Sequence, residues 1–484
     1  MRFRALVLAT WWSLSTLEFS DDLTTPFFIL IEAVIMVSAY LLSQLTRWKP
    51  IYQYLSRLWR CVIPIRALAD MERGADDSLF PPEWDAQAYL AAINDIDILQ
   101  LASSYNMGKK CEEFGKRTRG SFNFCVFVVF PEDDTKWVVR FPICPLLHEP
   151  WRKLQSEAAT LEYLQANTTI RVPGVKAHGD GAGLHPKSQA KFPFIILEYI
   201  SGRPLEYSEI LRSPPGALRP LFAELGDALS QLRALEFQYG GALMKDGTNG
   251  YTITSPNSIG LNSLQLKGLR SHTPRYTSAL EFAMCHFKTL RQQFSLPSEE
   301  MEEYIAQREV FALQDFELRL YQFIDPALNL QPFVLSHGDL RPPNIIVNED
   351  LSLAGIIDWE WSGTVPVQFF RPPLWLGGVD ATSPRDMKYR SGYSELYDSL
   401  VDANKHPNAS QTLASEWGPH LSSSLHLFLP AALLRTALFI DIYYMAIFPE
   451  FYKDCKRDDK LKDLYESCSK FREMVREQME TVCI

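Results

Sequence analysis

The stretch "LSHGDLRPPNIIVNEDLSLAGIIDWEW", residues 335–361, places acidic side chains among runs of isoleucine, valine and leucine. Two of these runs, residues 345–347 and 354–357, are typical of short buried strands, because they are apolar and rich in branched side chains. The polar "NED" at residues 348–350 predicts the turn between them. The stretch therefore predicts a buried hairpin with carboxylates along its edge.

Three polar residues of this stretch fall where the predicted strands begin and end. Asp339 and Asn344 share a loop that the prolines of "LRPP" stiffen, and one hairpin returns Asp358 to the same edge. A carboxylate beside core strands must be paired, hydrogen-bonded or bound to a metal, because burying it bare is costly. A base, an amide oxygen and a second carboxylate are the parts of a magnesium nucleotide site. The alternative is structural, with each aspartate capping a turn.

Composition excludes several classes of protein. The chain has 484 residues, which favours two or three domain-sized units. Its net charge of −10 argues against a nucleic-acid partner, which would require a basic surface. Eight cysteines without CxxC pairs argue against a zinc site or a disulfide scaffold, and they suit a reducing, cytoplasmic location.

The first 80 residues differ from the rest. "ALVLATWWSLSTL" follows two arginines like a signal peptide, but no small-residue cleavage site comes after it. Residues 27–42 are apolar but somewhat short for a membrane span and include Glu32, so a buried or interfacial helix is favoured. The alternative is a membrane anchor with the catalytic region in the cytosol. Residues 73–85 read as a linker.

The remaining chain predicts a sheet followed by helices. Residues 86–105 have helical periodicity, and residues 122–130 and 137–142 are strands joined by the turn "PEDDTK". A helix over 149–167 and strands over 171–179 and 192–200 complete an antiparallel sheet with one inserted helix. From Gly202 the pattern is mainly helical, and the apolar residues 422–448 favour a buried helix or pair of helices over a membrane span.

The phrase "HGDLRPPNIIV" followed by "IIDWEW" resembles the aminoglycoside phosphotransferase-like branch of the protein-kinase-like fold, most closely its fungal members. "RGSFN", "WVVRFP", "LQSEAATLEYLQ" and "FIILEYISGRPL" precede it in the order that this family requires. The resemblance covers residue 84 to about residue 452. It implies an α+β, two-lobed fold, with a small antiparallel-sheet amino lobe over 84–200, a larger helical carboxy lobe over 201–484, and residues 1–80 as an extension outside the match.

The resemblance also implies roles for the motif residues. Asp339 would be the catalytic base that orients the acceptor hydroxyl or amine, and Asn344 and Asp358 would hold magnesium on the ATP phosphates. His337 looks like the family's loop-bracing histidine. We interpret Trp359 and Trp361 as packing residues, and Glu360 as solvated or structural, with a third metal contact as the alternative.

On the nucleotide side, the turn "KRTRGSFN" would lie over the phosphates, with the backbone amides of Gly120 and Ser121 as donors; a plain hairpin turn is the alternative. Arg140 occupies the place of the protein-kinase strand lysine, and Glu157 that of its helix partner. Arginine is a permanent, forked cation that can bridge a carboxylate and a phosphate. The alternative for Glu157 is an exposed helix carboxylate. Glu198 to Ile200 would form the hinge whose backbone binds adenine.

We therefore predict an ATP- and magnesium-dependent phosphotransferase that acts on a hydroxyl or amine of a small molecule. The acceptor would lie over the helical lobe, bounded by residues 202–257 and 362–376. Relatives of this fold phosphorylate aminoglycosides, choline, amino alcohols and sugars, so the fold alone names no acceptor. One alternative is a catalytically inactive, pseudokinase-like binding or scaffold protein, because an arginine replaces the lysine. A membrane-tethered interaction protein is the third hypothesis.

Overall fold

The computed structural model describes residues 85–480 except 249, 271–272, 296–300, 381, 383–385, 404, 419–423 and 454. The predicted extension over residues 1–80, with its apolar segment 27–42, lies outside the described residues.

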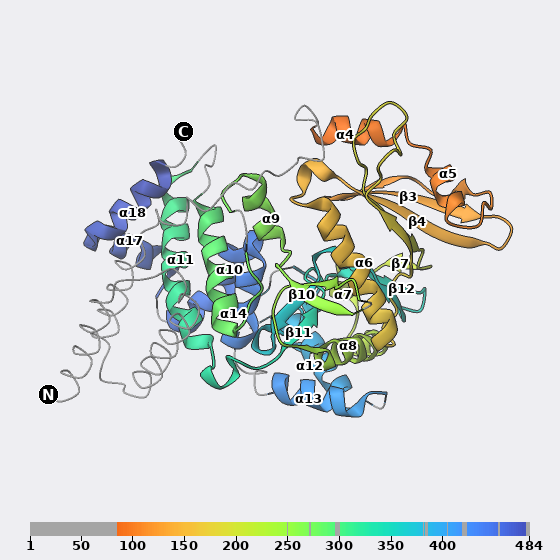
Figure 1. Cartoon of the computed structure of the whole chain (residues 1–484). Helices are drawn as coiled ribbons and strands as arrows, with labels where there is room; N and C mark the ends of the chain where they lie inside the picture. The colour runs from red at the N-terminus through yellow and green to blue at the C-terminus, as the bar shows by residue number, and fades with distance from the viewer. Residues whose placement is uncertain are drawn as a thin grey trace. The chain divides into compact units, whose positions relative to one another are not determined.

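An antiparallel sheet forms the first part of the described chain (Figure 1). Its strand order is β1-β3-β4-β6-β5, with β2 also paired to β3. The strands are β1 (Glu112–Glu113), β2 (Thr118–Arg119), β3 (Asn123–Phe130), β4 (Thr135–Pro142), β5 (Val175–Gly179) and β6 (Phe194–Glu198). The predicted antiparallel sheet with one inserted helix is confirmed, since α6 (Pro150–Asn167) lies between β4 and β5 in the chain.

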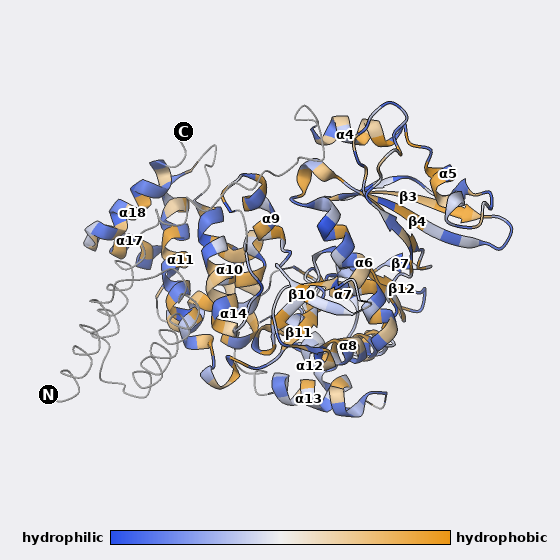
Figure 2. Ribbon diagram, in the orientation of Figure 1, coloured by the Kyte–Doolittle hydropathy of each residue, from blue (hydrophilic) through white to orange (hydrophobic). Residues whose placement is uncertain are grey.

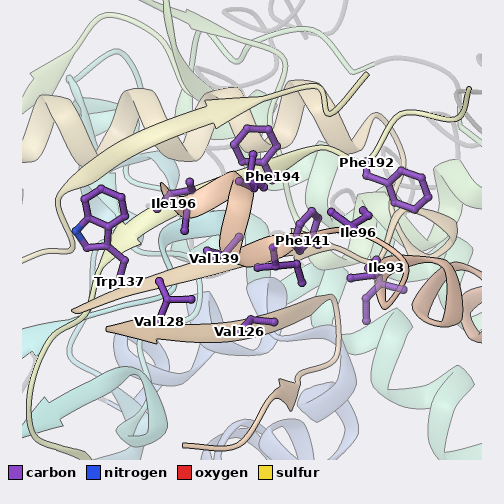
Figure 3. Packing of buried hydrophobic residues seen from close by; sticks show 14 of the residues in the cluster. Ile93, Ile96, Val126, Val128, Trp137, Val139, Phe141, Phe192, Phe194 and Ile196 are labelled. Carbon is purple, nitrogen blue, oxygen red and sulfur yellow. The ribbon is translucent and has the colours of Figure 1, made fainter. Parts of the chain in front are cut away.

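The two faces of β4 have different roles. Side chains alternate across a strand, so Trp137, Val139 and Phe141 point to one face. That face packs with β3, β6 and the first helices into one apolar cluster, part of which Figure 3 shows. Arg140 points to the opposite face, where its guanidinium contacts Glu157 of α6. The period of two thus sends one charged side chain away from the apolar cluster and toward α6.

The helical periodicity of residues 86–105 resolves into two helices rather than one. Helix α4 (Ala86–Ile93) ends before Asp97, whose side chain accepts a hydrogen bond from the Gln100 amide and caps α5 (Ile98–Ser104). An aspartate that bonds nearby backbone amides competes with helix continuation and starts a new helix instead.

The second part is mainly helical, as predicted. Its helices are α7 (Tyr207–Arg212), α8 (Arg219–Ala234), α9 (Ile259–Leu266), α10 (Ala279–Phe294), α11 (Glu303–Phe323), α12 (Met387–Val401), α13 (Pro407–Trp417), α14 (Ser424–Leu434), α15 (Phe439–Ile442), a π-helical turn (Tyr443–Ile447), α16 (Phe448–Phe451), α17 (Arg457–Ser467) and α18 (Ser469–Glu480). Figure 2 shows that α17 and α18 carry mostly hydrophilic residues, as a charged surface segment should.

Short strands hold the predicted hairpin in this helical part. Strand β12 (Ile345–Val347) pairs with β13 (Leu353–Ile356) and with β7 (Arg203–Pro204). Strand β11 (Phe333–Ser336) lies between β8 (Glu236–Phe237) and β14 (Gly363–Pro366), and β9 (Ala242–Lys245) pairs with β10 (Tyr251–Thr254). The sequence expectation of a buried hairpin over the "NIIVNED" stretch is confirmed, because β12 is fully buried.

Among the described residues, no single helix has the length and apolar character to cross a membrane. One pair, Leu425–Leu434 with Thr436–Phe451, passes the same test only when the two helices are taken together, and the chain bends by 117° between them. The side chains of Phe428, Leu429, Ile442 and Tyr443 in this pair are fully buried inside the protein, as the predicted buried pair requires.

Candidate active site

His337 fixes the loop that follows β11. Its buried ring donates through Nε2 to the Ile357 carbonyl oxygen (2.8 Å) and accepts at Nδ1 from the Asp339 amide (3.3 Å). Burial lowers the pKa of His337 to about 4, so the ring is neutral and can fill both roles. The predicted bracing role is therefore seen in the geometry, since one imidazole joins the Asp339 loop to the segment that carries Asp358.

Glycine is required at position 338 because the backbone of Trp361 approaches it closely. Its φ of +79° lies in the left-handed region, and a Cβ atom at this position would collide with the carbonyl oxygen of Trp361. The loop and the "DWEW" segment therefore lie closer than any residue with a side chain would permit.

Asn344 ties Asp339 to Asp358 through the backbone. Its Nδ2 donates to the Asp339 carbonyl oxygen at 2.8 Å and reaches a carboxylate oxygen of the same residue at 3.4 Å. Its own carbonyl accepts from the Ile357 amide at 2.9 Å, next to Asp358. Because the amide nitrogen is held by the loop, the oxygen Oδ1 is the end of this side chain that can serve a cation.

Asp358 adopts a conformation that is uncommon for a residue with a side chain. Its φ of 65° and ψ of 56° are left-handed, and its carboxylate makes no cap to the short 3-10 turn Trp359–Trp361 that follows. The structural alternative, in which Asp358 caps this segment, is therefore wrong. Burial and the neighbouring Glu360 carboxylate raise the pKa of Asp358 to about 7, whereas the nearby Arg140 guanidinium opposes that rise.

Arg140 connects the sheet to this loop. Its Nη2 pairs with Glu157, and its Nη1 lies 3.4 Å from Asp358 Oδ1. Arg140 and Glu157 are both buried, so the alternative of an exposed Glu157 carboxylate is wrong. The guanidinium of Arg140 stays charged, because the carboxylates of Glu157 and Asp358 outweigh its loss of hydration and raise its pKa. One forked cation thus joins the central strand, helix α6 and the loop of Asp358.

A second buried ion pair lies beside the first. Lys153, one turn before Glu157 on α6, places Nζ 2.7 Å from Glu360 Oε2. Lys153 and Glu360 are only 4% and 5% exposed, so Glu360 is not solvated, and its buried ion pair agrees with the structural interpretation. The ammonium group also lies 3.3 Å from the centre of the Trp361 ring and 5.3 Å from that of Phe122. Trp359 and Trp361 are buried, which confirms them as packing residues.

The predicted phosphate turn is a tight connection between β2 and β3. The Gly120 amide donates to the Asn123 carbonyl oxygen at 2.8 Å, so it is already engaged inside the turn. Ser121 is exposed at the tip. Phe122 stacks edge to face on Trp361 with ring centres 5.0 Å apart, which holds the turn over the "DWEW" segment. The geometry therefore favours Ser121 over Gly120 as the residue that could donate a hydrogen bond to a phosphate.

The predicted hinge begins at the end of β6. The Glu198 amide donates to the Gly174 carbonyl oxygen and the Tyr199 amide to that of Lys136, at 2.8 and 3.0 Å. Ile200 packs against Gly355 of β13. Within the described residues the Ile200 amide has no partner, so this amide, with the neighbouring carbonyls, is what the segment offers to a purine base.

The other side of Asp339 carries charges that sequence reasoning missed. Arg341 Nε lies 3.1 Å from Asp339 Oδ2. Arg435, just after α14, lies 3.0 Å from Asp380 Oδ1, and the Tyr207 hydroxyl donates to the same oxygen. Burial raises the pKa of Asp339, and the charges of Arg341 and Arg435 both oppose that rise.

Residues 123–369, just over half of the chain, match the model of the phosphotransferase enzyme family. The chain belongs to this family. The predicted resemblance is thus confirmed, and with it the α+β, two-lobed, protein-kinase-like fold of this phosphotransferase.

Individual relatives are more distant. The clavilactone A biosynthesis cluster protein Y of Ampulloclitocybe clavipes is 28% identical over 249 residues, which are 49% of this chain and 57% of that protein. The chain therefore matches less than two thirds of that relative. Among solved structures, a wild-type aminoglycoside 2'-phosphotransferase in its GDP complex aligns with a TM-score of 0.40 and 13% identity, covering 79% of this chain and 97% of that one. The Plasmodium vivax ethanolamine kinase aligns with a TM-score of 0.40 and 11% identity, covering 84% and 98%.

Asn344 and Asp358 are the residues of this loop whose oxygens could hold a metal ion. In the part of the chain that the structure describes, no group of three or more His, Cys, Asp or Glu residues is arranged to hold a metal ion. Asn344 and Asp358 offer two hard oxygens instead. Magnesium in nucleotide sites commonly takes one or two protein ligands and completes its shell with phosphates and water, so two oxygens suffice.

The residues that sequence reasoning missed left few signals. Lys153 stands four residues before Glu157, which places both on one face of α6, but this spacing does not show that its partner is Glu360. Arg341 follows Asp339 by two residues. Asp380 and Arg435 lie far along the chain from the motif, and only the fold brings them near it.

Proposed function

We propose that this phosphotransferase moves the γ-phosphoryl group of ATP, with magnesium, onto a hydroxyl or amine of a small molecule. The observation that carries the proposal is the His337-braced loop, which joins Asp339, Asn344 and the Asp358 segment by hydrogen bonds. We further propose a cytosolic location, where ATP and magnesium are both abundant.

Asp339 is the proposed base. In the transfer, the acceptor oxygen or nitrogen forms a bond to the γ-phosphorus, and the bond from that phosphorus to the bridging oxygen of ADP breaks. The acceptor proton passes to the carboxylate of Asp339. Arg341 at 3.1 Å and the Asn344 amide hold that carboxylate in place, so the acceptor is oriented rather than strongly activated.

Asn344 and Asp358 are the proposed magnesium ligands, and Arg140 the cation that orients the phosphates. Bound magnesium would neutralise the phosphate charge during transfer. Arg140 fits its role because Glu157 fixes one side of its fork while the other side faces Asp358. Ser121 from the turn and the Ile200 amide from the hinge are the proposed contacts to phosphate and base.

The second candidate is a binding or scaffold protein without catalysis. One observation favours it: the Nη1 atom of Arg140 lies 3.4 Å from Asp358 itself, so the proposed metal ligand already has a cationic partner. A magnesium ion would have to share or displace this contact.

The deciding experiment measures the melting temperature of the full chain with ATP, with ATP plus magnesium, and with ATP plus a chelator. A ligand that binds only the folded state stabilises it by about 2.7 kcal/mol at 100 times its Kd. We expect the largest rise with ATP and magnesium together, and slow ADP formation in water without any acceptor. Equal shifts with and without magnesium contradict the metal roles. A magnesium-dependent shift without ADP formation, across a broad panel of acceptors, favours the scaffold.

A further inference from the structure

Three segments that are distant in sequence meet beside the proposed base. The Trp375 indole donates to the Leu340 carbonyl oxygen at 2.7 Å, which holds the segment that leads to Asp380 against the Asp339 loop. Tyr207, at the start of α7, donates its hydroxyl to the Asp380 carboxylate. Arg435 reaches both the carbonyl and the carboxylate of Asp380, at 3.2 and 3.0 Å.

Three of the four charged side chains of this cluster are partly open to solvent, whereas Asp339 is 19% exposed. The side chains of Arg341 and Arg435 are 41% and 29% exposed, and that of Asp380 is 40% exposed. Lys153 and Glu360, by contrast, are sealed inside the protein. A molecule that approaches Asp339 from this side therefore meets guanidinium groups that it can contact directly.

Both carboxylates of the cluster already have a guanidinium partner. Asp339 faces Arg341, and Asp380 faces Arg435. Pairing alone favours neither sign of charge, because an ammonium at either carboxylate would meet a guanidinium and an anion at either guanidinium would meet a carboxylate. Among the described residues of this cluster, the donors that the guanidinium groups leave unused therefore decide which acceptor fits.

The guanidinium groups, in contrast, keep unused donors. Arg341 Nε lies 3.1 Å from Asp339 Oδ2 but is buried without a hydrogen-bond partner, so this ion pair leaves the donors of Arg341 unused among the described residues. Arg435 uses one N–H of each Nη group on Asp380, which leaves three of its five donors. Planar forks of this kind bind carboxylate and phosphate groups in a bidentate manner.

We propose that the acceptor carries an anionic group, a carboxylate or a phosphate, which Arg341 and Arg435 bind while Asp339 orients its hydroxyl or amine. The phosphotransferase would thus act on a small acid rather than on a polyamine or an amino alcohol. This inference rests on the proposed function, because it needs Asp339 to be the base.

A matched set of four compounds tests the charge preference on one skeleton. The compounds are 4-(hydroxymethyl)benzoate, its methyl ester, 4-(aminomethyl)benzyl alcohol, and 4-(hydroxymethyl)phenylphosphonate. Calorimetry with magnesium and ADP present measures the affinity of the full-length protein for each. We expect at least one of the two anions to bind about tenfold or more tightly than the ester, and the amine to bind most weakly. The ratio of benzoate to phosphonate binding distinguishes a carboxylate acceptor from a phosphorylated one.

Equal affinities for the four compounds, including no binding of any at 10 mM, overturn the inference, as does a preference for the amine. If the protein binds neither ATP nor magnesium, the result contradicts the proposed function instead. The two failures are distinguishable, because nucleotide binding and slow ADP formation are measured without any acceptor.

Variants assign the preference to the two arginines. Arg435→Gln should weaken binding of the preferred anion by 10- to 100-fold, the scale of a lost charge-assisted contact, and Arg435→Lys should recover part of it. Arg476→Gln is the matched control, because Arg476 is an exposed arginine paired loosely with Glu480 on α18. Anion binding that is unchanged in both Arg435→Gln and Arg341→Gln contradicts the assignment. So does an Arg341→Gln effect on acceptor-free ADP formation alone, which would place Arg341 on the γ-phosphate.

Discussion

The two sides of the candidate site carry charge in opposite ways. On the proposed nucleotide side, two ion pairs are almost wholly buried, and Trp361 covers one of them; they join Arg140 to Glu157 and Lys153 to Glu360. On the proposed acceptor side, Arg341 pairs with Asp339 and Arg435 with Asp380, and these side chains are 19% to 41% exposed.

This difference separates the charges that hold the fold together from those that could select a substrate. Breaking a buried pair leaves a charge without hydration, so the charges on the proposed nucleotide side hold strand β4, helix α6 and the "DWEW" segment in one arrangement. An exposed pair contributes little to folding, because water and salt screen it. We therefore expect replacement of the charges on the proposed acceptor side to cost little stability, and replacement of those on the proposed nucleotide side to cost more.

The largest expected effect lies where the two sides meet. Asp339→Asn should reduce transfer to an acceptor by about 10²- to 10⁴-fold, the contribution of a positioned base, while ATP and magnesium still bind. Asp358→Asn should reduce both binding and transfer, because it removes a charge from the proposed metal shell. Calorimetry for binding and ADP release for turnover separate the two. Normal turnover in both variants would locate the chemistry elsewhere.

The next largest effect concerns the buried ion pair between Lys153 and Glu360. Lys153→Met should destabilise the fold by about 3 to 5 kcal/mol, because it leaves the buried Glu360 carboxylate without its partner. Urea unfolding measures this loss. Adding Glu360→Gln to Lys153→Met should restore part of the stability, since the uncompensated charge is gone. A single variant as stable as wild type would mean that Glu360 finds another partner.

A smaller effect concerns Arg140, whose guanidinium is proposed to contact the nucleotide. Arg140→Ala should weaken ATP binding by about 1 to 3 kcal/mol, and Arg140→Lys should recover part of it, because a point charge lacks the fork. Stability must be measured alongside, since Glu157 also loses its partner. If the folded variant binds ATP with unchanged affinity, Arg140 serves the fold alone.

The smallest expected effect is the loss of stability when the ion pair between Arg435 and Asp380 is broken. Arg435→Gln should cost no more than about 1 kcal/mol of unfolding free energy, the usual value of an exposed ion pair, although it removes the same kind of contact as Lys153→Met. Urea unfolding of both variants in one buffer measures the contrast directly. A loss as large as that of Lys153→Met would make the acceptor side a structural element rather than a selective one.

Much of the fold could be predicted because its signals are local. The strands β3 and β4, helix α6 and the β12–β13 hairpin each follow from the periodicity of one short stretch. The break between α4 and α5 could not, because the capping hydrogen bond of Asp97 competes with a periodicity that runs through it. The roles of the site residues remain proposals.

The sequence by itself determined the braced loop of the site. His337, Asp339, Asn344 and Asp358 lie within one loop and one hairpin, so their spacing in the chain nearly fixes their spacing in space. The tertiary structure alone decided which charges surround them. Lys153 meets Glu360, and Arg435 meets Asp380, only because helices and strands pack across long stretches of chain. A charged residue in a sequence shows neither its burial nor its partner, and these two properties determine whether it holds the fold together or faces a substrate.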